Sequence, residues 1–263
     1  MALDGIAVSN IIYELNKSLI GGRIDKIYQP QKDEIVMSVR NNGTSKLLLS
    51  ANPSHPRLHI TTIQRENPIT APMFCMVLRK HIAGSRILSI SQYGLERIAS
   101  IKVEAVNEMG DMVERNLIIE IMGKHSNIIL TDENGKILDS IKHITHETSS
   151  VREVLPGKTY SFPPSQDKLN PLELDFETFK TRFKQAEGMK IQQFIYKTYT
   201  GISPVSASEI AFEAGVNPEN YTPQETEKDI ENIYSAFSAT MEKVKNGDFS
   251  PEIISEPKTK KVI

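Results

Sequence analysis

The stretch RILSISQYGLERIASIKVEAV, residues 86–106, holds two runs typical of β-strands, RILSISQY and RIASIKVEAV, and indicates a β-rich first part of the chain. Where the runs meet, Glu96 and Arg97 place an acid directly beside a base. Adjacent strand residues point to opposite faces of a sheet, so these two charges cannot easily neutralise each other. Each can pair with a charge on a neighbouring strand or find its partner outside the chain. The pair also suits a nucleic-acid base edge, because Arg donates in a fork and a carboxylate accepts from an amino group.

Further strand-like runs lie on both sides of this stretch, separated by turn-forming residues. They are RIDKIYQ, EIVMSVR, KLLLSA and RLHITT before it, and RNLIIEIM, NIILTD and KILDSIK after it. Asp132-Glu133-Asn134-Gly135 predicts a hairpin turn between the last two runs. Two helices interrupt the strands. The first has Asp4 as its N-cap and ends at Gly21-Gly22, and the second is MFCMVLRKHI, in which Cys75 is a small, partly buried residue. The first unit is therefore predicted to be mostly antiparallel β with two helices.

A proline-rich segment, EVLPGKTYSFPPSQDKLNPLEL, predicts a linker and a domain boundary near residue 165. We expect a β-rich domain over 1–165, an all-α domain over 166–250, and the start of a further segment over 251–263, which is an α+β class overall. The predicted helices cover about 173–186, 190–199, 204–214 and 223–246. Ser203-Pro204 and Thr222-Pro223 each offer an N-cap followed by proline.

The join between two of these helices, YTGISPVSASEIAFEAG, has the outline of a helix-hairpin-helix. In that motif the N-terminus of the second helix presents free backbone N–H groups to phosphate. A plain turn in a helical bundle explains the same residues. Residues 166–263 carry 12 Lys+Arg against 16 Asp+Glu, and this acidic balance favours that structural alternative.

The composition, 39% apolar and 24% charged over 263 residues, is that of a globular protein. No apolar run approaches the roughly 20 residues of a membrane helix, and Asp4 stands where a secretory signal carries positive charge. We therefore expect a cytoplasmic protein. The single cysteine, Cys75, excludes an internal disulfide and a cysteine-based zinc cluster. The net charge of −2 argues against a histone-like grip on nucleic acid.

Short polar motifs predict no catalytic, metal or cofactor site. HITH, residues 143–146, has two histidines but no third ligand. GKHSN, residues 123–127, lies between two strands, where it can grip a phosphate or form a tight polar turn. The chain shows neither a nucleophile elbow nor a Gly-rich phosphate loop. The sequence thus predicts a protein that is not an enzyme.

Several motifs in order, from residue 1 to about residue 246, together resemble the NFACT proteins. They are MALDG, ANPSHPRLHIT, ENPITAPMFCMVLRKHI, GLERI, MGKHSNIILTD, VREVLPGKTYSFPP and GISPVSASEIAFEAG. The resemblance implies a first unit similar to the N-terminal domain of the formamidopyrimidine-DNA glycosylases, followed by a helix-hairpin-helix domain. A coiled coil and a further RNA-binding domain normally follow in the family, so this chain is similar to the N-terminal part of such a protein.

The resemblance also implies a role in ribosome-associated quality control. Such proteins bind the large ribosomal subunit with its obstructed peptidyl-tRNA, recruit chiefly alanyl-tRNA, and support template-free addition of alanine, while the ribosome forms the peptide bonds. Glu96 and Arg97 match the family's acid-Arg pair, usually Asp-Arg, which is associated with tRNA recognition near the anticodon. Asp4 matches a second acid associated with function. Two further stretches match family motifs and are assigned RNA contact: Arg79-Lys80-His81 and Lys124-His125-Ser126.

Two other functions compete with this interpretation. A DNA glycosylase of that fold uses an N-terminal proline as its amine nucleophile, whereas position 2 here is Ala2, followed by Leu3 instead of an acid, so that chemistry is expected to be lost. The older family label suggests an adhesin that binds fibronectin or fibrinogen. The sequence shows no signal peptide, wall-sorting segment or repeat array, and these absences argue against export. The adhesin therefore ranks second, behind a tRNA-recruiting factor.

Overall fold

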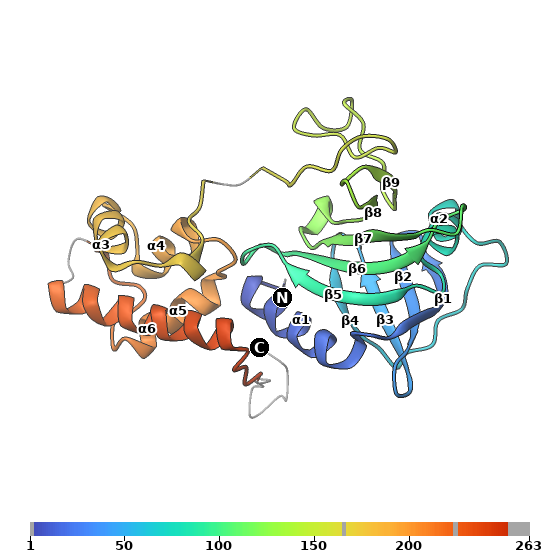
Figure 1. Cartoon of the computed structure of the whole chain (residues 1–263). Helices are drawn as coiled ribbons and strands as arrows, with labels where there is room; N and C mark the ends of the chain where they lie inside the picture. Colours follow the sequence, from blue (N-terminus) through green and yellow to red (C-terminus); the bar gives the residue numbers. More distant parts are fainter. Residues whose placement is uncertain (1–2, 165–166, 223–225, 252–263) are drawn as a thin grey trace.

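The computed structural model describes residues 3–164, 167–222 and 226–251, and within them all strands form one antiparallel sheet (Figure 1). Its order is β4-β3-β2-β1-β5-β6-β7-β8-β9. The strands are β1 Arg23–Gln31, β2 Glu34–Arg40, β3 Thr44–Ser50, β4 Arg57–Ile60, β5 Arg86–Gln92, β6 Ile98–Val106, β7 Met112–Glu120, β8 Asn127–Asp132 and β9 Ile137–Ser140. The sheet and its helices confirm the predicted α+β class.

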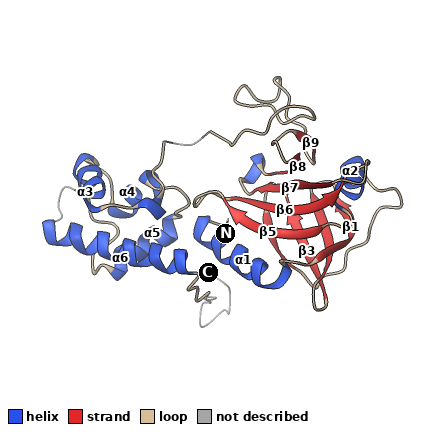
Figure 2. Cartoon of the chain, viewed as in Figure 1, coloured by secondary structure: helices blue, strands red, loops and turns tan. Residues whose placement is uncertain are grey.

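The sheet curves around one apolar core, to which strands from both ends of the sheet order contribute. Leu58 of β4 and Ile128 of β8 belong to the same buried cluster, although their strands lie near opposite ends of the sheet order. Two helices complete this core, α1 Gly5–Leu19 and α2 Met73–Ile82, as Figure 2 shows. Val8 of α1 and Leu78 of α2 are fully buried there, and each such side chain contributes about 1.5–3 kcal/mol relative to its exposed state.

The predicted N-cap of the first helix is confirmed, because the Asp4 carboxylate accepts a hydrogen bond from the Ala7 backbone N–H. The second helix begins after Pro72 and buries Cys75 completely. The turn between β8 and β9 is also as predicted, with the Asp132 carboxylate accepting from the backbone N–H groups of Asn134 and Lys136.

The first half of the predicted linker packs on the outer face of the sheet. Val154 lies in a small buried cluster with Ile98, Ile118 and other residues of β6–β9. Glu120 at the end of β7 is fully buried, accepts from the Tyr160 hydroxyl at 2.9 Å, and pairs with the Arg152 guanidinium. Burial and the neighbouring Glu120 carboxylate raise the pKa of Tyr160 above its ordinary range. The course of this segment is therefore fixed by a buried charge cluster up to the two prolines at 163 and 164.

Helices make up the second part of the chain: η2 Pro171–Glu173, α3 Phe176–Gln185, α4 Ile191–Thr198, α5 Pro204–Glu213 and α6 Glu227–Asn246. They surround a second core rich in aromatic rings, among them Phe179, Phe194 and Phe237. α1 lies between this helical part and the sheet (Figure 1). None of the described helices is long and apolar enough to cross a membrane.

One predicted helix start is confirmed and another is wrong. Ser203 caps α5 and Pro204 is its first residue, as predicted. α6 instead begins at Glu227, because Thr226 and Asp229 form a reciprocal capping box. Thr222, the predicted cap, is buried, and its hydroxyl donates to the Ala186 carbonyl.

Four predictions fall on positions outside the described residues. These positions are Ala2, the domain boundary at 165–166, the proline at 223, and the segment from 252 onward.

Candidate functional site

The candidate site forms where three backbone segments meet: the start of α1, the turn between β5 and β6, and the turn between α4 and α5. The Gly5 N–H donates to the Gly201 carbonyl at 2.7 Å. A Cβ atom on Gly201 would lie 2.0 Å from the Leu95 carbonyl oxygen, and one on Gly5 would lie 2.1 Å from the same atom. Gly201 also has a φ of 74°, which favours glycine. Both positions therefore require glycine, and together they lock the Leu95 turn against the helices.

Leu95 anchors this turn from within. Its side chain is only 1% exposed and belongs to the core of the helical part, although Leu95 follows a strand of the sheet. On one side of the turn, the Gln92 side-chain amide donates to the carbonyls of Glu96 and Gly5 at 2.8 and 2.9 Å. On the other side, the Arg97 carbonyl accepts from the Ile121 N–H at 2.8 Å. The backbone that carries the acid and the base is thus held at both ends.

The side chains of Glu96 and Arg97 are half-buried and form no hydrogen bond or ion pair with any described residue. The cross-strand pairing that we considered as an alternative is not seen in this part of the chain. Lys168 lies near enough to interact electrostatically with the Glu96 carboxylate and the Arg97 guanidinium. Burial lowers the pKa of its ammonium group, the Glu96 carboxylate raises it, and the Arg97 guanidinium lowers it. The acid and the base therefore remain free to engage a ligand.

A cavity of about 560 Å³ lies at this junction and brings three of the predicted residues together. Asp4, Glu96 and Arg97 all line it, with Lys168 and the α5 cap Ser203. Sequence reasoning missed Lys168, a single lysine in a polar segment with no motif around it. The volume lies within the range of sites that hold a small molecule or one group of a larger ligand.

Asp4 uses both of its carboxylate oxygens inside the protein. Oδ1 accepts from the Ala7 N–H at 2.9 Å, and Oδ2 accepts from the Ser206 hydroxyl at 2.6 Å. Asp4 therefore ties the N-terminal end of α1 to the first turn of α5. In the same turn, Ser203 Oγ accepts from the Ser206 N–H at 3.1 Å.

The structure places Arg79, Lys80 and His81 on α2, and none of them lines this cavity. Arg79 Nε donates to the Ile27 carbonyl at 2.9 Å, and Lys80 pairs with Glu108 at 2.6 Å. Burial lowers the pKa of His81, and the positive charges of Arg115 and Lys80 lower it further, against an opposing effect of Glu108. Two of the three predicted RNA-contact side chains on this helix thus have partners within the chain.

Lys124, His125 and Ser126 lie in and just after the short helix η1 Gly123–His125, which directly follows the cavity-lining Met122. Lys124 and His125 are exposed, so their predicted RNA contact remains a prediction. Ser126 is fully buried, and its hydroxyl accepts from the Met122 N–H at 2.8 Å. Ser126 therefore closes a tight polar turn, which is one of the two alternatives considered for GKHSN.

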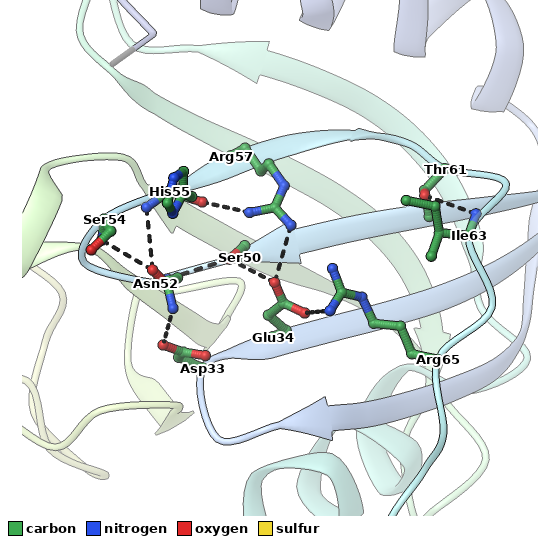
Figure 3. A network of polar contacts seen from close by, with 10 residues as sticks. All are labelled: Asp33, Glu34, Ser50, Asn52, Ser54, His55, Arg57, Thr61, Ile63 and Arg65. Atoms are coloured by element: carbon green, nitrogen blue, oxygen red, sulfur yellow. Dashed lines mark hydrogen bonds and ion pairs between the residues drawn. The ribbon is translucent and has the colours of Figure 1, made fainter. Parts of the chain in front are cut away.

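A polar network surrounds another motif of the sequence, ANPSHPR, and gives it a structural role (Figure 3). Asn52 Oδ1 accepts from the N–H groups of Ser54 and His55, while Asn52 Nδ2 donates to Asp33 at 3.1 Å. The buried Glu34 forms ion pairs with the guanidinium groups of Arg57 and Arg65 at 3.2 and 3.3 Å. These contacts fix the loop between β3 and β4, and none of the residues in them lines the cavity at the α5 cap.

Comparison with known proteins identifies relatives of this chain. A family model described as the NFACT N-terminal and middle domains matches residues 4–263. The Rqc2 homologue RqcH of Bacillus subtilis (strain 168) is 44% identical over 218 residues, which cover 82% of this chain and 38% of that relative. The human ribosome quality control complex subunit NEMF is 29% identical over 143 residues, covering 54% of this chain and 12% of that protein.

A similar solved structure carries a name that refers to fibronectin binding instead of ribosome quality control. The crystal structure of the N-terminal domain of the fibronectin-binding protein PavA from Streptococcus pneumoniae has a TM-score of 0.72 and 40% identity. The similarity covers 79% of this chain and 77% of that chain. This chain spans 38% of the length of the bacterial relative.

Proposed function

The chain belongs to the NFACT family, and on that premise we propose that it is the tRNA-binding part of a ribosome-associated quality control factor. In this proposal the protein acts in the cytoplasm, binds large ribosomal subunits that carry an obstructed peptidyl-tRNA, and recruits alanyl-tRNA for template-free alanine addition. The names of two relatives support it, one an Rqc2 homologue and the other a ribosome quality control complex subunit. The ribosome forms the peptide bonds, so we assign no catalytic step and no cofactor to this chain.

The observation that carries the proposal is the unpaired acid and base in the cavity. Arg97 offers a rigid fork of N–H donors, and Glu96 offers carboxylate acceptors, which is the pairing needed to read a base edge. Partly removing two charges from water without pairing them costs free energy, which a ligand that pairs with them recovers. The Leu95 anchor and the glycine lock hold both side chains on a fixed backbone, as a specific site requires.

The proposal also covers two finer points of fold. We assign α4 and α5 to a helix-hairpin-helix, supported by the tight turn at Gly201 and the Ser203 cap of α5. We assign the sheet with α1 and α2 to the fold of the glycosylase N-terminal domain. Asp4 bridges the two units in this arrangement, because it accepts hydrogen bonds from both Ala7 and Ser206.

Binding of purified alanyl-tRNA and of a non-cognate tRNA across a salt series tests this function. Arg97→Ala is expected to weaken alanyl-tRNA binding by about 1–3 kcal/mol, the usual value of one good base contact, and to reduce selectivity between the tRNAs. The matched control is Arg86→Ala, an exposed arginine at the opposite end of β5, which removes the same charge away from the cavity. A contact to phosphate alone would change the salt dependence without changing selectivity. Unaltered binding by the Arg97 variant, with folding intact, would refute the proposal.

The second candidate function is binding of fibronectin or fibrinogen, favoured by the similarity to the PavA domain. It predicts saturable binding of purified fibronectin that does not depend on Arg97. The same pair of arginine variants therefore separates the two functions. Fibronectin binding by both variants, with no tRNA binding by the unmodified chain, would favour the adhesin.

A further inference from the structure

Two exposed aromatic rings stand at the rim of the cavity and have no role in either core. Tyr93 is 56% exposed and Phe162 is 46% exposed, yet their rings are stacked with centroids 4.0 Å apart and planes inclined by 22°. Both line the same cavity as Glu96 and Arg97. Burial of a large apolar side chain is more favourable than its exposure to water. An ordered, exposed pair of rings therefore indicates a surface that another flat group can cover.

The ring from the 160–164 segment is held by a rigid support. The Tyr160 ring meets the Phe162 ring edge-on at 5.4 Å, and the Tyr160 hydroxyl donates to the buried Glu120. Arg152, which pairs with the same carboxylate, donates to the Ser161 carbonyl at 2.6 Å. The two prolines that follow, residues 163 and 164, restrict the backbone further. Phe162 is therefore fixed before any ligand arrives, which lowers the entropy lost on binding.

The other ring belongs to the turn that carries the two charges. The Tyr93 carbonyl accepts from the Glu96 N–H at 2.9 Å, so ring, acid and base are parts of one short loop. Lys168 adds a positive charge close to Glu96 and Arg97. Aromatic faces beside arginine and lysine are the combination that binds unpaired nucleic-acid bases, because the ring stacks on the base while the cations engage its edge and phosphate. A base within a duplex is already stacked on both sides and cannot use such a surface.

We infer that Tyr93 and Phe162 form a stacking platform for one unpaired RNA base, whose edge then lies against Glu96 and Arg97 in the cavity. The inference rests on the proposed function for the identity of the ligand as RNA. It deepens that function by adding two contact residues and by specifying that the bound base is unpaired. A base flipped out of a tRNA loop is both part of an RNA and unpaired.

A fluorescent variant tests the platform independently of tRNA selection. The chain contains no tryptophan, so Tyr93→Trp introduces a single reporter at the platform. A seven-nucleotide unstructured RNA is expected to quench this tryptophan saturably, and the same RNA with abasic nucleotides is not. Phe212→Trp, at a 74% exposed position near the end of α5, is the control reporter and is expected to remain unquenched.

Measuring the tRNA affinity of variants at Tyr93 and Phe162 tests the same surface. Tyr93→Ala and Phe162→Ala should each weaken tRNA binding by about 5- to 150-fold, the range for loss of one stacked base. Tyr93→Phe and Phe162→Tyr keep a ring and should bind within about twofold of the unmodified chain, since every aromatic face stacks. Thermal unfolding of each variant verifies that the fold is kept.

The outcomes separate this inference from the function on which it rests. If tRNA binding depends on Arg97 but the alanine variants bind normally and the reporter is not quenched, the platform is refuted while the tRNA function stands. If the unmodified chain does not bind tRNA, the proposed function is refuted. Quenching of the position-93 tryptophan by the unstructured RNA would then still support the platform, and lack of quenching would refute it. Equal quenching at positions 93 and 212 would indicate nonspecific contact and refute the platform.

Discussion

Replacing Asp4 by alanine tests whether this residue serves the structure or the ligand. Resemblance to the family assigns Asp4 to tRNA binding, whereas the structure engages both of its oxygens, one with Ala7 and one with Ser206. Asp4→Ala removes both acceptors at once. The Ala7 N–H in the first turn of α1 loses its capping partner, and the hydrogen bond from Ser206 in the first turn of α5 is lost as well.

The expected cost can be worked out bond by bond. Loss of an N-cap costs about 1 kcal/mol. A hydrogen bond from a hydroxyl to a charged group is worth about 1.5–3 kcal/mol, and the half-buried position of Asp4 favours the lower end of that range. The sum is roughly 2–3 kcal/mol of unfolding free energy for Asp4→Ala. Asp4→Asn should cost less than half of that, because asparagine caps a helix as well as aspartate does.

Urea unfolding followed by circular dichroism measures these differences as shifts of the midpoint at constant slope. Ser206→Ala and the double variant complete a thermodynamic cycle, whose coupling energy should be about 1–2 kcal/mol if the two side chains bond as seen. The reasoning is refuted if Asp4→Ala costs less than about 0.5 kcal/mol while tRNA affinity falls as far as it does in Arg97→Ala. That result would make Asp4 a direct contact of the RNA.

Two further predictions concern the close approach of Gly201 to Leu95 and the half-buried His81. Gly201→Ala places a Cβ 2.0 Å from the Leu95 carbonyl at a φ of 74°, so it should lower the unfolding free energy by roughly 2–4 kcal/mol and weaken tRNA binding. Gly215→Ala, with the same φ and open space around it, should cost only about 1 kcal/mol and leave binding unchanged; equal costs would show that the close approach is relaxed in solution. Because the pKa of His81 is lowered below 6.5, the unfolded chain takes up this proton first, so stability is full above pH 6.5 and falls as the pH decreases toward the folded pKa. His81→Asn should flatten that decline in urea midpoints measured between about pH 5 and pH 7.5, whereas His55→Asn, at an exposed position, should not; an unchanged decline in the His81 variant would contradict the assignment.

Local features of the fold could be predicted because their causes lie within a few residues. Asp4 and Ser203 cap their helices through hydrogen bonds to groups three positions away, and Asp132 closes its hairpin within four. Thr222 shows the limit of such reasoning. Its sequence context suits a cap, but the Thr226–Asp229 box supplies two reciprocal bonds, and a tertiary contact to Ala186 takes the Thr222 hydroxyl.

The candidate site could be predicted only in part, because it depends on contacts between distant segments. Glu96 and Arg97 stand out as adjacent opposite charges in a strand-like run, which any reading of the sequence can detect. The approach of Gly5 and Gly201 to Leu95 spans most of the chain, and no local pattern reveals it. For the same reason the sequence could not show that the Arg79 Nε–H group donates a hydrogen bond to the Ile27 carbonyl.

The site therefore depends on both parts of the molecule. The sheet supplies the turn with Glu96 and Arg97, but that turn is anchored by Leu95 in the helical core and locked by Gly201 between two helices. Asp4 adds a bond that joins α1 of one part to α5 of the other. Any shift of the helices against the sheet would move the charged pair, because backbone contacts transmit it directly. Binding at the cavity and docking of the two parts must then be thermodynamically linked, so that a ligand on Glu96 and Arg97 also strengthens the contact between sheet and helices.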